Sequence, residues 1–202
     1  MSFMIIEDKG QQAGKHETKH LWFTEHQIEM LQAPLPVGDY ILSNEKVIDV
    51  ISRKEKRGIA VKKMDFIGTY KVCVDTKKDM QEIVSNICGK QHARFRDECL
   101  LAQNNGITLY VLIENEENIT CIEEVMNWKN PRLTKYEKIV EMHQIGKWKH
   151  IEVSKIPPTS GEILAKAMKT MEEKYDVKFL FCNPAEAAER ILSLLTKETG
   201  GI

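Results

Sequence analysis

The spacing of hydrophobic residues along the chain predicts strands and helices in alternation. Apolar runs typical of strands lie within residues 4–6, 37–42, 107–113 and 176–182. Apolar residues at helical spacing predict helices over 20–31, 78–87, 92–104, 159–175 and 183–195. Three β-rich pieces separated by turns, at 47–51, 59–61 and 70–74, predict an antiparallel meander. This order of elements favours an α/β fold with a mixed central sheet flanked by helices.

The length and composition are those of a globular domain. The 202 residues match the usual size of one domain, so we expect residues 1–202 to form a single one. Hydrophobic residues make up 42% of the chain and charged residues 29%, which excludes collagen-like and wholly disordered proteins. No apolar run reaches the ~20 residues of a membrane span, and Glu7 and Asp8 stand where a signal peptide has its apolar core. We therefore expect a cytoplasmic protein without membrane contact.

Two carboxylates and a lysine predict a metal site for phosphodiester hydrolysis. Residues two apart on a strand share a face, so Asp75 and Lys77 project together. Asp39 follows Gly38 at the start of an earlier strand, and pairing of the two strands would bring both acids to one Mg²⁺ or Mn²⁺. The hydrolysis needs a metal that neutralises phosphate and generates hydroxide, and a cation near the developing charge. The alternative is a salt bridge at the surface.

Basic residues are concentrated between Arg53 and Lys78, where nine of them face three acidic residues in a chain of net charge -1. Such an excess suits contact with DNA phosphates, and a solvated hairpin is the alternative. We expect a basic β-hairpin insertion over about residues 44–70, and a less regular segment over about 129–158. The predicted DNA-binding residues of the insertion are Arg53, Lys54, Lys56, Arg57, Lys62 and Lys63.

The segment His16-Glu17-Thr18-Lys19-His20 matches a zinc-peptidase motif, in which two histidines bind zinc and the glutamate activates water. His26 stands at the spacing of a third ligand. However, Phe23 occupies the position where that class has glycine, and only 15 residues precede His16, too few for the supporting sheet. The peptidase is therefore a weaker hypothesis than a solvated, histidine-rich start of a helix.

The sequence resembles the XPF-type nuclease family, within the PD-(D/E)XK superfamily of metal-dependent nucleases. The family pattern is a Gly-Asp pair, then Glu-Arg-Lys closing a strand, then a helix with a further acid. Gly38-Asp39 and Asp75-Thr76-Lys77 are similar to this pattern, and the strand ends at Glu7-Asp8 and Glu114 match as well. Two positions depart from it: Thr76 stands in place of arginine, and Gln81 in place of the last acid, with Glu82 beside it.

The resemblance implies a restriction-endonuclease-like core and a set of site residues. The catalytic residues would be Asp39, Asp75 and Lys77, and the metal site would comprise Asp39, Asp75 and Thr76. An additional acid would come from Glu7, Asp8 or Glu82. The match to the family's helix adds Arg94 to the DNA-binding residues.

The activity implied is that of a DNA endonuclease dependent on Mg²⁺ or Mn²⁺. Its substrate would be DNA that is branched or has single-stranded parts, in repair, recombination or phage DNA processing. The chain would be a small stand-alone version from a bacterium or a phage-infected host, with self-association into a homodimer left open. The departures at Thr76 and Gln81 favour a second hypothesis, a DNA-binding protein of the same fold whose catalytic site has decayed.

Overall fold

A computed structural model describes residues 4–10 and 16–197 of the chain. Six strands form one sheet, in the order β2-β1-β3-β4-β5-β6. β3 runs antiparallel to β1 and β4, whereas β1 pairs with β2, and β5 with both β4 and β6, in parallel. The predicted mixed α/β sheet is thereby confirmed. The strands are β1 (Met4–Asp8), β2 (Glu29–Ala33), β3 (Tyr40–Leu42), β4 (Val72–Lys77), β5 (Thr108–Glu114) and β6 (Lys178–Cys182).

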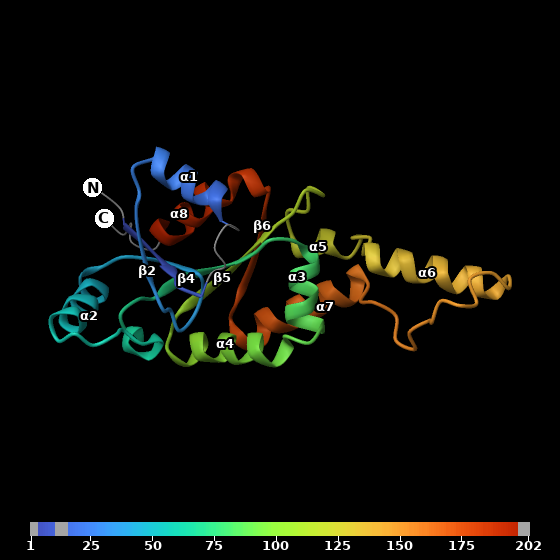
Figure 1. The fold of residues 1–202 in the computed structure, drawn as a ribbon, viewed down its shortest axis with the longest axis horizontal. Helices are drawn as coiled ribbons and strands as arrows, with labels where there is room; N and C mark the ends of the chain where they lie inside the picture. The colour runs from blue at the N-terminus through green and yellow to red at the C-terminus, as the bar shows by residue number, and fades with distance from the viewer. Residues whose placement is uncertain (1–3, 11–15, 198–202) are drawn as a thin grey trace.

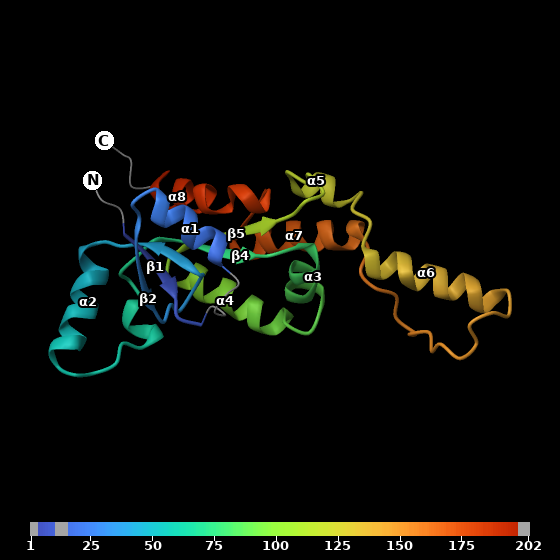
Figure 2. The same cartoon turned by 45° about the horizontal axis from the view of Figure 1, so that its top comes forward.

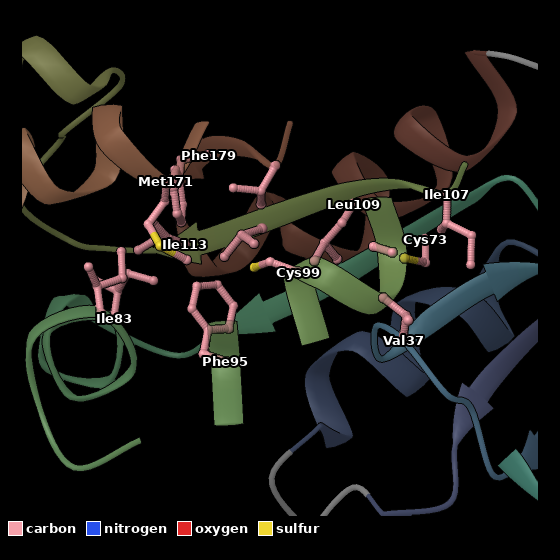
Figure 3. Close-up of a cluster of buried hydrophobic side chains, with 14 of the residues drawn as sticks. Val37, Cys73, Ile83, Phe95, Cys99, Ile107, Leu109, Ile113, Met171 and Phe179 are labelled. Carbon is pink, nitrogen blue, oxygen red and sulfur yellow. The ribbon is translucent and has the colours of Figure 1, made fainter. Parts of the chain in front are cut away.

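Helices cover both faces of the sheet (Figure 1). α1 (Glu17–Glu25) and α8 (Ala187–Lys197) pack on the face that carries Val74 and Leu112. α3 (Met80–Cys88), α4 (His92–Asn104) and α7 (Gly161–Tyr175) cover the opposite face, where Phe95 and Cys99 of α4 lie against β5 (Figure 3). None of the described helices combines the length and the apolarity that a membrane span requires.

Residues 45–56 form a helix, α2 (Glu45–Lys56), where a strand of a basic hairpin was expected. The Asn44 side chain caps this helix by accepting a hydrogen bond from the Val47 amide. Val47, Val50 and Ile51 are buried, at helical spacing and not at the alternation of a strand. The chain then makes a 3₁₀ turn over Lys63–Phe66 and forms no strand before β4. The predicted hairpin and meander are therefore wrong, because the apolar residues of this β-branched run bury one face of a helix.

Two further segments differ from the expectation. The helix over 20–31 ends at Glu25, because Gln27 has a φ of 57°, and residues 29–33 form the edge strand β2. The segment 129–158 contains α6 (Pro131–Gln144), which projects from the body beyond the short helix α5 (Ile122–Val125) (Figures 1 and 2). Only its return, after residue 144, is irregular as expected.

Candidate active site

Asp75 and Lys77 lie at the carboxyl end of β4, on the face covered by α3 and α4. They are only 4% and 7% exposed, and Lys77 Nζ lies 2.6 Å from Asp75 Oδ2. The same ammonium group lies 5.5 Å from the ring centroid of Phe95 on α4. The alternative of a surface salt bridge is therefore wrong, because both partners are buried.

Asp39 reaches this pair from the loop that precedes β3. Its amide donates a hydrogen bond of 2.8 Å to the carbonyl of Val74, which aligns the loop with β4. Its Oδ2 atom accepts hydrogen bonds of 2.8 Å from both the amide and the hydroxyl group of Thr76. The Asp39 carboxylate consequently adjoins that of Asp75 and acts on its ionisation. The structure thus brings together the three predicted catalytic residues, with Thr76 holding Asp39.

The electrostatics of the site favour a bound cation. Burial raises the pKa of Asp75 to about 7, with Lys77 opposing and Asp39 reinforcing the shift. Burial would lower the pKa of Lys77, but the Asp75 and Asp39 carboxylates outweigh it and raise that pKa. Asp75 Oδ2 is in ion-pair contact with Lys77 but receives no aligned hydrogen bond. The single positive charge of Lys77 therefore does not balance the negative charges of the two adjacent carboxylates, which leaves the site attractive to a further cation.

Glu98 on α4 joins the site and was absent from the predicted site residues. Its Oε1 atom accepts a hydrogen bond of 2.9 Å from the Gly38 amide, next to Asp39. Burial and then the Asp75 charge raise the pKa of Glu98. The signal for Glu98 was its position three residues after the buried Phe95, which places it beside the buried stripe of α4.

Gly38 sets the position of Asp39 and provides a test of the site's packing. Its φ is +74°, and an added Cβ atom would lie 2.8 Å from Cys73 Cβ. Gly38→Ala should therefore lower the free energy of unfolding by about 2–5 kcal/mol, the sum of backbone strain and overpacking. Gly58→Ala is the control, because Gly58 has a φ of +63° with nothing within 4 Å of an added Cβ atom. Equal losses in urea unfolding would mean that the contact with Cys73 is unimportant.

The three candidate additional acids have other partners. Burial would raise the pKa of Glu7, but hydrogen bonds from His20, Gln32 and Tyr40 outweigh it and lower that pKa. Asp8 adjoins Asp39 through its backbone, while its carboxylate accepts from the Leu35 amide and lies 3.7 Å from Lys63 Nζ. Glu82 accepts from the Lys78 amide at the start of α3, as part of the helix cap.

Gln81, at the position of the family's last acid, has a structural partner. Its side-chain amide donates a hydrogen bond of 2.8 Å to Asn130 Oδ1. Asn130 is buried and in turn donates to the carbonyl of Thr159 at 2.7 Å. Gln81 therefore ties α3 to the segment around residue 130.

The predicted DNA-binding residues of the central stretch are exposed, except Lys54, which is partly buried, and several of them form ion pairs with acids. Arg53 pairs with Asp49 at 3.0 Å and Lys54 with Asp65 at 2.8 Å, both at the end of α2. No ion pair among the described residues involves Lys56, Arg57 or Lys62. Arg94 is exposed on α4, and its charge acts on Glu98, beside the acids of the site.

The residues of the zinc motif are not arranged as a zinc site. His20 Nε2 lies 2.7 Å from Glu7 Oε1, and His26 stacks on Trp22 with ring centroids 3.8 Å apart. Glu17 is exposed in the first turn of α1. Across residues 4–10 and 16–197, no three His, Cys, Asp or Glu side chains form a group that could hold a metal ion. The peptidase hypothesis is therefore wrong for the described part of the chain.

Comparison with known proteins places the chain in a family. Residues 8–195 match the model of the ERCC4 domain. Two solved structures of XPF from Aeropyrum pernix, one in complex with DNA, are similar at 12% sequence identity, with TM-scores of 0.49 and 0.48. Each match covers 97% of this chain but only 61% and 64% of the respective XPF chain. No curated protein matches. With nearly its whole length matched, the chain belongs to the ERCC4 domain family.

Proposed function

We propose that this protein is a metal-dependent endonuclease that hydrolyses DNA phosphodiester bonds with selectivity for branched or partly single-stranded DNA. The observation that carries the proposal is the buried Asp75–Lys77 pair beside Asp39 at the carboxyl end of β4. Membership of the ERCC4 domain family supports it. The cellular setting would be repair, recombination or phage DNA processing.

The donor atoms of the site fit a hard divalent cation. Mg²⁺ is usually bound in proteins by one or two carboxylates, with waters and substrate phosphate completing its shell. Two carboxylates are therefore enough for such an ion, although the described residues contain no group of three His, Cys, Asp or Glu side chains that could hold a metal. Asp39 and Asp75 would hold Mg²⁺ or Mn²⁺, and Thr76 would orient Asp39 through the two hydrogen bonds to its Oδ2. The ion would neutralise phosphate charge and lower the pKa of a bound water. Two features support this fit: the excess of negative charge at the site, and the buried Asp75 Oδ2 atom, which accepts no well-aligned hydrogen bond.

Lys77 would act on the phosphate that reaches the site. Its ammonium group is held in place by Asp75 and by the ring of Phe95, so its position needs no reorganisation during the reaction. It would orient the attacking water or stabilise the charge of the pentavalent phosphate. Glu98 would position the loop of Asp39 through the Gly38 amide.

The proposal is tested by cleavage of a panel of flap, fork, junction and plain duplex DNA with Mg²⁺ or Mn²⁺. We expect cuts near the junctions and none with EDTA. Tight DNA binding without cleavage under any of these conditions would instead support the decayed-site hypothesis, which Gln81 favours because it replaces an acid of the family pattern and binds Asn130.

The end of α2 would contact DNA phosphates, and its ion pairs predict which residues contribute most. Arg53 and Lys54 are partly neutralised by Asp49 and Asp65, whereas no ion pair in the described residues involves Lys56 or Arg57. In the double variant Lys56→Gln/Arg57→Gln, the association constant K for DNA should fall less steeply with salt. The magnitude of the slope of log K against log salt should decrease by about 0.9 per lost contact.

The matched control is Arg53→Gln/Lys54→Gln, which removes the same formal charge from the same helix end and should change the slope less. Fluorescence anisotropy over a salt series measures both variants. Unchanged slopes in both would mean that α2 is merely solvated.

A further inference from the structure

Beyond the buried Asn130, the segment 129–158, here called the arm, contributes no buried residue to the body of the protein. α6 projects from the body at the end opposite to α2, and the chain returns alongside it (Figures 1 and 2). None of residues 131–158 is buried. Because burial of apolar surface is the main source of folding stability, the arm is not explained by the stability of the domain.

The charges of the arm are unlike those of the rest of the chain. It carries seven lysines and arginines against three glutamates, a net charge of +4 in a chain whose total is -1. The remainder of the protein is therefore acidic, at -5. No ion pair among the described residues involves an arm residue, whereas five basic residues between 53 and 78 are paired with acids. The arm thus presents its positive charges uncompensated.

The charges on α6 are separated by face. Arg132, Lys135 and Lys138 follow one another at three-residue spacing, which places them within about a third of the helix circumference. Glu137 and Glu141 fall on the opposite half of the helix by the same geometry. All five side chains are exposed. The return segment approaches this helix at Lys138, whose Nζ is 6.0 Å from the ring centroid of Trp148.

The root of the arm is joined to the helix that follows the catalytic strand. Asn130 accepts a hydrogen bond from Gln81 of α3 and donates one to the carbonyl of Thr159, so it joins the outgoing and returning chain. α3 begins at Met80, three residues after Lys77. A linear polyanion lying along the arm would therefore run toward the proposed site.

We propose that the arm is a second DNA-binding surface, which holds the duplex next to the cleavage point by its phosphates through the basic face formed by Arg132, Lys135 and Lys138. This inference rests on the proposed function. A row of exposed cations that form no ion pair within the described residues suits the dense negative charge of a duplex, one charge per ~1.7 Å of its axis. The contacts would be independent of base sequence, because phosphates carry no sequence information.

The experiment compares three proteins, each carrying Asp75→Asn so that DNA is bound and not cut. The first has no other change, the second has Arg132→Gln/Lys135→Gln/Lys138→Gln, and the third has Glu137→Gln/Glu141→Gln on the opposite face of the same helix. Glutamine retains helix propensity, and circular dichroism checks the fold. Anisotropy of a labelled 30-bp duplex is followed over a salt series.

We expect the triple variant to bind more weakly and to lose roughly 2 to 3 from the slope of log K against log salt. The double variant should bind as tightly as the parent or more tightly. An unchanged slope in the triple variant, or equal losses in both variants, would overturn the inference while leaving the proposed function intact if the unmutated protein cleaves DNA. Absence of DNA binding by the parent would overturn both.

Discussion

Replacing Asp75 by asparagine should abolish DNA cleavage while the protein still binds DNA. Asparagine has the shape of aspartate but no charge, so the variant loses one of the two carboxylates proposed to hold the metal. DNA affinity should be unchanged or higher, because a negative charge next to the phosphate is removed. The measurements are cleavage of a flap substrate with Mn²⁺ and anisotropy of the same DNA.

Asp79→Asn is the matched control for this substitution. Asp79 is four residues further along the chain and caps α3 by accepting a hydrogen bond from the Glu82 amide, a role that asparagine performs equally well. The Asp79 side chain is about half exposed. The Asp79→Asn variant should therefore cleave DNA like the unmutated protein. Activity retained by Asp75→Asn would contradict the assignment of the metal site. Urea unfolding of the Asp75→Asn variant measures how much stability the protein loses when the buried Lys77 no longer has a charged partner.

Replacing Lys77 by alanine should slow cleavage by about 10²–10³-fold, the usual effect of removing one preorganised charge from an active site. Lys77 is the cation nearest the two carboxylates, and burial keeps water from screening it. The variant should still bind DNA, because the proposed duplex contacts lie on α2 and on the arm. Single-turnover cleavage at saturating protein measures the chemical step.

Lys78→Ala serves as the control for position. Lys78 follows Lys77 directly, but its side chain is 66% exposed and only 3.9 Å from Asp79. Removal of an exposed charge of this kind costs ~0–1 kcal/mol of stability and should leave the rate unchanged. If both lysine variants are equally slow, or both retain full activity, the assignment of Lys77 is wrong and the decayed-site hypothesis replaces it.

The strands that build the site could be predicted because their patterns are unambiguous. β4 begins with an apolar run and ends in Asp75-Thr76-Lys77, and β5 is apolar for most of its length and ends in Glu114. Because residues two apart on a strand share a face, the sequence correctly predicted that Asp75 lies beside Lys77. The helix after residue 159 could be predicted as well, since Ser160 caps it by accepting from the Ile163 amide. In these segments local propensity and tertiary packing favour the same structure.

The errors come from segments in which local signals compete. The run over 47–51 is rich in valine and isoleucine, yet Val47, Val50 and Ile51 bury one face of a helix. Residues 29–33 have little β-propensity. They form β2 because parallel pairing with β1 provides hydrogen-bond partners for their backbone amide and carbonyl groups. Pairing partners distant in sequence decide such cases, and a single sequence does not display them.

The composition of the site could be predicted only in part, for the same reason. Asp39, Asp75 and Lys77 are marked by their positions at strand ends, but Glu98 is linked to them through the Gly38 amide, 60 residues away. The hydrogen bond between Gln81 and Asn130 spans 49 residues, and nothing in either local sequence indicates it. Long-range hydrogen bonds of this kind require the folded structure.

The absence of buried residues from 131–158 also bears on how this protein can diverge. Substitutions at exposed positions usually change stability by no more than about 0.5 kcal/mol. The projecting segment can therefore gain, lose or relocate charges, or change its length, with little penalty in folding, whereas the residues around Asp75 are fixed by close packing. If the proposed function holds, selection on substrate preference would act on a segment that is linked to the site only through its root at Asn130, so related chains would share one reaction centre and differ in the nucleic-acid geometry they accept.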